Sequence, residues 1–173
     1  MRLMLVDDHQ ILRDGLRRSF ESAGEVVVGE ADNGAEAVDK AAQLLPDVIV
    51  MDLTMPVLDG IEATRRICAE RPEQRIVVLT MHDDVERTRA AIEAGAVGYL
   101  AKGSSFADVL DTVRKVHAGE TGLSPALAGL MLKAIPAERH PDEALRSARH
   151  MEILRLGAGG MATKQAAREL GIP

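Results

Sequence analysis

Residues 47–60 read DVIVMDLTMPVLDG, and this stretch decides the fold class. Residues 48–51 are apolar without alternation, which is typical of a strand that is covered on both faces of its sheet. Asp52 follows directly, and the segment closes with a turn that contains Pro56 and Gly60. A buried strand that ends in a carboxylate predicts a parallel sheet with polar groups at its carboxyl edge.

The same pattern recurs along the first two thirds of the chain. Further apolar runs occupy 3–6, 26–30, 76–80 and 97–101, and amphipathic segments occupy 10–22, 34–45, 59–70, 84–94 and 105–118. Five strand-then-helix units predict an α/β fold, a (βα)5 doubly wound parallel sheet with helices on both faces and right-handed crossovers.

Composition restricts the class of protein. The chain has 173 residues, of which 46% are hydrophobic, enough for one full domain and a smaller segment. Cys68 is the single cysteine, which excludes an intrachain disulfide and a cysteine-based metal site. The start of the chain lacks a signal-peptide pattern, and no apolar run approaches the length of a membrane span. We therefore expect a cytoplasmic protein without a membrane partner.

The charge is unevenly distributed. The net charge is −6, and residues 119–173 hold 7 Lys and Arg against 6 Asp and Glu, so the first 118 residues carry the acidic excess. Strong binding to DNA needs a basic stripe, and the sequence shows none.

Five polar residues stand where the apolar runs end. Asp7 and Asp8 follow the first run, Asp52 follows the third, Thr80 ends the fourth, and Lys102 follows the fifth. Because the carboxyl ends of parallel strands share one edge, we expect these side chains to lie together. Three neighbouring carboxylates repel one another, and Mg²⁺ relieves this repulsion through oxygen ligands.

This set of groups predicts phosphoryl chemistry. A carboxylate beside a divalent cation can act as a nucleophile and form an aspartyl-phosphate. The transfer needs positioning and charge neutralisation, which Lys102 would supply as a compact positive charge and Thr80 as a hydroxyl donor.

Four motifs in order resemble those of one protein family. They are LVDDH (5–9), VMDLTMPVLDG (50–60), VLTMHDD (78–84) and GYLAKG (98–103). Together they resemble a two-component response regulator of the LuxR/NarL type, over residue 1 to about residue 118. The resemblance implies a flavodoxin-like receiver domain.

The resemblance also implies roles for the acidic residues. Asp52 would accept a phosphoryl group from a sensor histidine kinase. Asp8 and Asp52 would hold Mg²⁺ with the backbone carbonyl of Thr54, and Asp7 would help through water. The simpler interpretation is that an Asp after a strand caps the next helix. His9 is expected to be an exposed residue at the start of the first helix, not a ligand.

The remaining roles concern the switch. By the same resemblance, Thr80 and Lys102 would bind the phosphoryl oxygens. Tyr99 would be the aromatic switch that turns inward as Thr80 moves toward the phosphate. The alternatives are ordinary strand propensity for Thr80 and ordinary packing for Tyr99.

The last part of the chain has a different character. We expect a linker with a short helix at 119–141, after the receiver at 1–118. The stretch SARHMEILRLGAGGMATKQAARELGI (147–172) resembles the start of a LuxR-type helix-turn-helix, so 142–173 is predicted to be an incomplete, all-α DNA-binding domain. Its recognition helix would follow the last residue, so we expect DNA binding only from a complete output domain.

Three functions compete. The leading one is a phosphorylation-controlled transcription regulator, for which the family also implies a homodimer. The second is a signalling module without DNA output, acting as a phosphoryl sink or a protein-binding partner. The third is a hydrolase or phosphotransferase, which would need a general acid two residues after the nucleophile, where Thr54 stands. We therefore expect no enzyme beyond its own phosphorylation and slow self-dephosphorylation.

Overall fold

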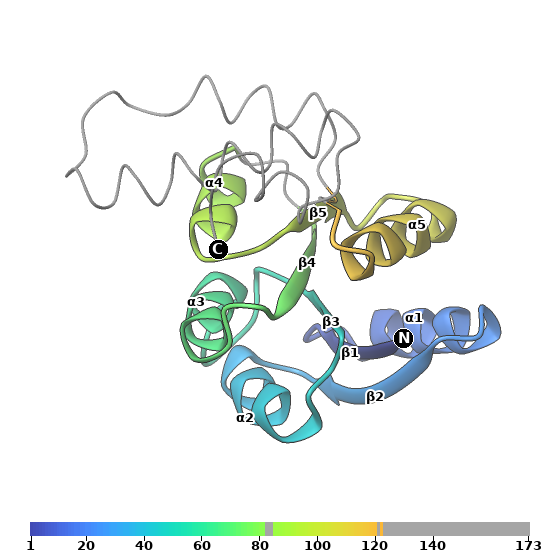
Figure 1. The fold of residues 1–173 in the computed structure, drawn as a ribbon, viewed down its shortest axis with the longest axis horizontal. Helices are drawn as coiled ribbons and strands as arrows, with labels where there is room; N and C mark the ends of the chain where they lie inside the picture. Colours follow the sequence, from blue (N-terminus) through green and yellow to red (C-terminus); the bar gives the residue numbers. More distant parts are fainter. Residues whose placement is uncertain (82–84, 121, 123–173) are drawn as a thin grey trace.

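The computed structural model describes residues 1–81, 85–120 and 122. In this part, five parallel strands form one sheet in the order β2-β1-β3-β4-β5, and a helix follows each strand (Figure 1). The elements are β1 (Arg2–Val6), α1 (Gln10–Ser22), β2 (Val26–Ala31), α2 (Gly34–Leu44), β3 (Val48–Met51), α3 (Gly60–Glu70), β4 (Arg75–Thr80), α4 (Val85–Glu93), β5 (Gly98–Ala101) and α5 (Phe106–His117). The predicted (βα)5 fold is therefore confirmed.

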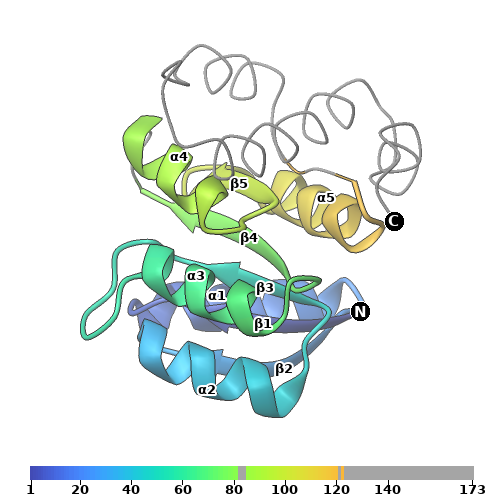
Figure 2. The same cartoon turned by 60° about the vertical axis from the view of Figure 1, so that its left-hand side comes forward.

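Helices cover both faces of the sheet. In Figure 1, α1 and α5 lie on one side of the sheet, and α2, α3 and α4 lie on the other. Figure 2 shows β2 and α2 at one end of the molecule and β5, α4 and α5 at the opposite end. On the α1/α5 side, Phe20 and Phe106 meet edge to face with ring centroids 5.2 Å apart. Apart from these rings and that of Tyr99, the core consists of non-aromatic side chains, as the shortage of aromatic residues requires.

Side-chain caps fix where three of the helices begin. The side chains of Asn33, Asp59 and Ser105 each accept a hydrogen bond from the backbone N–H three residues later. Such a bond satisfies one of the N–H groups that the first helical turn leaves unpaired. The predicted helices included Asp59 and Ser105 as first residues, whereas in the structure these residues are caps with extended backbone.

Residues with positive φ angles follow α2, α4 and α5. Gly95 after α4 and Gly119 after α5 have φ angles of 116° and 89°, and these helices end at Glu93 and His117, one residue before the predicted ends. The second helix ends differently, because Leu45 takes the left-handed conformation with φ 49° before Pro46.

The chain returns to the sheet after α5. Gly122 forms a parallel bridge with Gly98, donating to the Val97 carbonyl at 2.9 Å and accepting from the Tyr99 N–H at 3.3 Å. The short helix predicted within the linker at 119–141 and the predicted helix-turn-helix at 142–173 lie outside the described residues. In the described part of the chain, no helix combines the length and the apolarity needed to cross a membrane.

The single cysteine, Cys68, lies on α3 and packs against the turn after α4. An added Cβ at Gly95 would lie 2.7 Å from Cys68 Sγ. Burial raises the pKa of the Cys68 thiol from 9.0 to about 11. The thiol is therefore almost entirely protonated at neutral pH.

Alkylation of Cys68 by iodoacetamide at pH 8 should be roughly 100-fold slower in the folded protein than in urea. The thiolate is the reactive form, and its fraction falls tenfold for each unit by which the pKa rises. Mass spectrometry over time measures both rates. The folded state favours the protonated thiol, so stability should also decline as the pH rises from 9.0 toward about 11. Equal alkylation rates in both states would contradict the buried position.

Candidate functional site

The strand ends bring three charged side chains to one edge of the sheet. Asp7 follows β1, Asp52 follows β3 and Lys102 follows β5. Backbone hydrogen bonds extend the sheet through these positions. Asp52 N–H donates to the Val6 carbonyl at 2.8 Å, and Lys102 N–H donates to the Thr80 carbonyl at 2.8 Å. The positions of the three side chains thus follow from the parallel ladder itself.

Lys102 bridges the two buried carboxylates. Its Nζ lies 2.7 Å from Asp52 Oδ2 and 2.7 Å from Asp7 Oδ2, and all three side chains are at most 5% exposed. Burial by itself lowers the pKa of Lys102, but the hydrogen bonds that its ammonium donates to Asp52 and Asp7, together with their negative charges, outweigh burial and raise this pKa above the usual value. The ammonium group is therefore charged at neutral pH.

Asp8 and His9 complete a compact cluster beside this pair. Ligand atoms of Asp7, Asp8, His9 and Asp52 all lie within 4.8 Å of one another. His9 Nδ1 lies 2.7 Å from Asp8 Oδ1 and 3.1 Å from Asp7 Oδ1, and its side chain is 67% exposed. His9 is exposed as expected, but it also contacts the cluster. Its position directly after the two aspartates was the only sequence signal for this contact.

The donor set fits a hard divalent cation. Asp7 and Asp52 share the ammonium of Lys102, and Asp8 adds a third carboxylate, which leaves an excess of negative charge within the cluster. Mg²⁺ prefers a few carboxylate oxygens and keeps several waters, so Asp7, Asp8 and Asp52 could hold it.

Two backbone N–H groups fix the loop that follows Asp52. Thr54 N–H donates to Asp52 Oδ1 at 3.3 Å, and Gly60 N–H donates to the Leu53 carbonyl at 3.1 Å. A Cβ at Gly60 would lie 1.9 Å from the Asp52 carbonyl oxygen. Val57 takes a φ angle of 67°, which is uncommon for a β-branched residue. The first residue of α3 is thus packed against the backbone of the residue that bears the candidate nucleophile.

The two candidate switch residues are both buried. Thr80 is 1% exposed at the end of β4, and Tyr99 is 7% exposed in β5. Tyr99 belongs to an apolar cluster that includes Leu53 and Ile92. The Tyr99 ring is therefore already packed in the core of the domain in this structure. In the described part of the chain, the hydroxyl of Thr80 makes no hydrogen bond with Asp52 or Lys102.

Comparisons with known proteins agree with this geometry. The sequence matches the response regulator receiver domain over residues 3–114. The chain belongs to the response regulator family. The transcriptional regulatory protein LiaR of Bacillus subtilis is 41% identical over 179 residues, which cover 99% of this chain and 83% of LiaR. The response regulator UvrY of Escherichia coli is 33% identical, with 99% of this chain and 80% of UvrY covered.

A solved structure of a LuxR-family response regulator is similar to this chain. The crystal structure of a LuxR-family two-component response regulator from Aurantimonas sp. has a TM-score of 0.71 and 41% identity, and covers 76% of this chain and 95% of that protein. The predicted LuxR/NarL type and the flavodoxin-like receiver fold are thus confirmed.

Lys102→Met in this response regulator should lower the free energy of unfolding by roughly 3 kcal/mol, because two buried carboxylates lose their shared cation. Mg²⁺ should restore part of the loss by binding the same carboxylates. Thermal unfolding with and without Mg²⁺ measures both effects.

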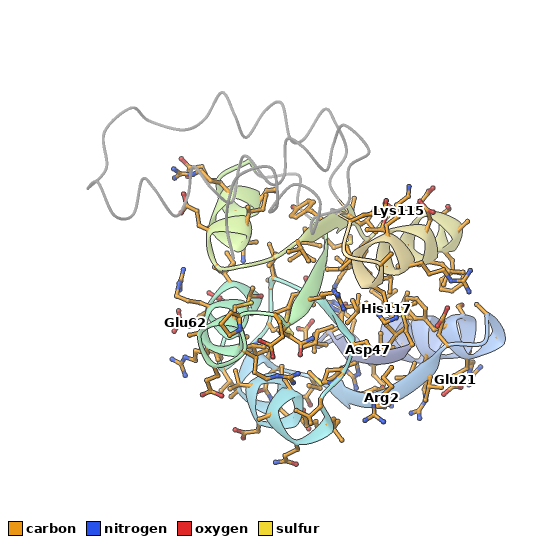
Figure 3. The ribbon with its side chains drawn as sticks, viewed as in Figure 1. Arg2, Glu21, Asp47, Glu62, Lys115 and His117 are labelled. Carbon is orange, nitrogen blue, oxygen red and sulfur yellow. The ribbon has the colours of Figure 1, made fainter. Side chains whose placement is uncertain are left out.

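The matched control is Lys115→Met, at the exposed surface of α5, where Lys115 pairs with Asp111 (Figure 3). Removing such an exposed pair should change stability by less than about 1 kcal/mol. Equal effects of the two variants would contradict the role of Lys102 in the cluster.

Proposed function

We propose that Asp52 is the phosphoacceptor of this response regulator and that the donor is a phosphohistidine of a sensor histidine kinase. A carboxylate oxygen of Asp52 attacks phosphorus, the P–O bond forms, and the P–N bond of the donor breaks with its electron pair left on the imidazole nitrogen. The observation that carries this assignment is the contact of Lys102 Nζ with Asp52 Oδ2 at 2.7 Å. That contact places a fixed cation beside the oxygen atoms of the acceptor.

Lys102 and Thr80 bind the oxygen atoms of the transferred phosphoryl group. The ammonium of Lys102 neutralises the charge of the phosphoryl oxygens, and it stays charged because Asp52 and Asp7 raise its pKa. Thr80 ends the neighbouring strand, and its hydroxyl donates to a phosphoryl oxygen once the group is attached. This pairing of groups supplies charge neutralisation and positioning, which are the main needs of phosphoryl transfer.

Asp8, Asp52 and the backbone carbonyl of Thr54 hold Mg²⁺ in this proposal, and Asp7 helps through water. The support is the compact carboxylate cluster with its excess negative charge. The bound cation offsets the repulsion between the carboxylates and the incoming phosphoryl oxygens.

The output signal passes from Thr80 to Tyr99 and on to the segment after α5. Tyr99 packs against the helix that follows Thr80, and its backbone N–H bonds to Gly122. A change in the packing of Tyr99 therefore acts directly on the chain that leaves the receiver. The receiver at 1–118, the linker at 119–141 and the LuxR-type helix-turn-helix segment at 142–173 form the proposed domain order.

The regulated output in this proposal is transcription, through a DNA-binding output domain and a homodimer. LiaR, a transcriptional regulatory protein, is similar over nearly the whole of this chain, which supports this output. A signalling module that acts only as a phosphoryl sink has no comparable support. The receiver phosphorylates itself from a donor and loses the group slowly, because Thr54 offers no general acid.

Intact mass spectrometry tests the proposal. The purified protein, treated with acetyl phosphate and Mg²⁺, should gain one phosphoryl group, and it should gain none when EDTA removes the cation. Peptide mapping should place the group on Asp52. Labelling that persists in EDTA, or labelling of another residue, would overturn the assignment.

A further inference from the structure

We propose that His9 provides a nitrogen ligand at the cation site, so that this receiver also binds the first-row divalent cations that favour imidazole, such as Co²⁺, Ni²⁺ and Zn²⁺. The inference rests on the proposed cation site, and it adds a ligand and a class of cation to that site.

The position of the imidazole is the first argument. His9 Nδ1 lies 2.7 Å from Asp8 Oδ1 and 3.1 Å from Asp7 Oδ1, so one ring nitrogen and two carboxylate oxygens converge. Lys102 occupies the other oxygen of Asp7, Oδ2, at 2.7 Å. Asp7 thus faces a fixed cation on one side and an imidazole on the other.

The backbone around His9 is the second argument. His9 is the N-cap of α1, yet its side chain makes no capping hydrogen bond to that helix. At the caps of α2, α3 and α5, the side chain does bond the helix. The His9 backbone N–H instead donates to Asp7 Oδ1 at 2.9 Å. A ring nitrogen and the backbone N–H of His9 are therefore directed to the carboxylates, while its carbonyl accepts a hydrogen bond from the Arg13 N–H of α1.

The chemistry of the ligands sets which cations gain from His9. Mg²⁺ is a hard ion that keeps its waters and gains little from a nitrogen ligand. For mixed nitrogen and oxygen ligands, affinity rises from Mn²⁺ through Co²⁺ and Ni²⁺. A cation at this position takes the place of the Nδ1 proton, which leaves to solvent, and the ring binds with its other nitrogen protonated.

Calorimetric titrations with Ni²⁺ alone and Mg²⁺ alone test the inference on the full chain. His9→Ala should weaken Ni²⁺ binding at least about tenfold, because even the loss of an outer-shell partner costs that much. It should change Mg²⁺ binding by less than about twofold, since oxygen ligands dominate there. His117→Ala removes an exposed histidine at the end of α5 (Figure 3) and should leave both affinities of the cluster unchanged.

A spectroscopic readout separates ligation from a change in folding. In the unmodified protein, Zn²⁺ should shift the NMR resonance of the His9 Nδ1 atom and leave the His117 ring resonances unchanged. Melting curves show whether His9→Ala is folded.

Asp8→Asn distinguishes the inference from the function on which it rests. If this variant loses both cations while His9→Ala keeps its Ni²⁺ affinity, the inference about His9 is overturned and the cation site stands. If Asp8→Asn keeps both affinities, the cation site itself is overturned, and the inference fails with it.

Discussion

We expect Asp52→Asn to abolish Mg²⁺-dependent phosphorylation and to leave the fold intact. The amide has no nucleophilic carboxylate oxygen, so the phosphoryl group has no acceptor. The replacement keeps the shape of the side chain, and Lys102 keeps the buried carboxylate of Asp7 as a partner. The substitution also removes one of the carboxylates that repel one another, so a stable protein is expected.

The measurement is intact mass after treatment with acetyl phosphate, with thermal unfolding to confirm the fold. Asp59→Asn is the matched control, because it makes the same chemical change in the same loop. Asp59 caps α3 through its side chain, and Asn caps helices equally well, so this variant should be phosphorylated like the parent. Full labelling of Asp52→Asn would show that another residue is the acceptor.

Gly60→Ala causes the largest structural effect that we expect from a single methyl group. The added Cβ would lie 1.9 Å from the carbonyl oxygen of Asp52 and 2.9 Å from Leu53 Cα. Both contacts are with backbone atoms, which cannot rotate away as a flexible side chain can. Either the start of α3 or the end of β3 must move, and overpacking of this kind should cost about 3 kcal/mol.

The same displacement reaches the candidate nucleophile. Moving the Asp52 backbone shifts its carboxylate relative to Lys102, and a misplacement near 1 Å can slow a reaction roughly 100-fold. We therefore expect Gly60→Ala to lower both the melting temperature and the rate of phosphorylation. Urea unfolding and time-resolved intact mass spectrometry measure the two effects.

Gly15→Ala is the matched control for the added methyl group. Gly15 lies in α1, where a Cβ would meet nothing within 4 Å. Alanine in a helix interior is more favourable than glycine by roughly 0.5–1 kcal/mol, so this variant should be slightly stabilised. A normal stability and rate for Gly60→Ala would mean that α3 can shift without cost and would contradict the close approach.

The sequence alone was enough to predict the arrangement of strands and helices and the site at their carboxyl edge. Continuous apolar runs that alternate with amphipathic segments are typical of covered parallel strands, and residues that follow such strands meet at one edge. Asp7, Asp52 and Lys102 therefore come together whatever the details of packing. The helix boundaries differ from the prediction by one residue at Asp59 and Ser105, which act as caps, and at the ends of α2, α4 and α5.

Contacts that depend on how elements pack were decided only by the tertiary structure. His9 stands just before α1, and its imidazole lies against the carboxylate of Asp8 instead of capping the helix. The approach of Gly60 to Asp52 depends on where α3 docks, and the burial of Tyr99 depends on the neighbours that α4 provides. Gly122 pairs with β5 after a turn whose direction no local pattern specifies. Periodicity describes one element at a time, whereas these contacts join atoms from separate elements and follow from the packing of the whole domain.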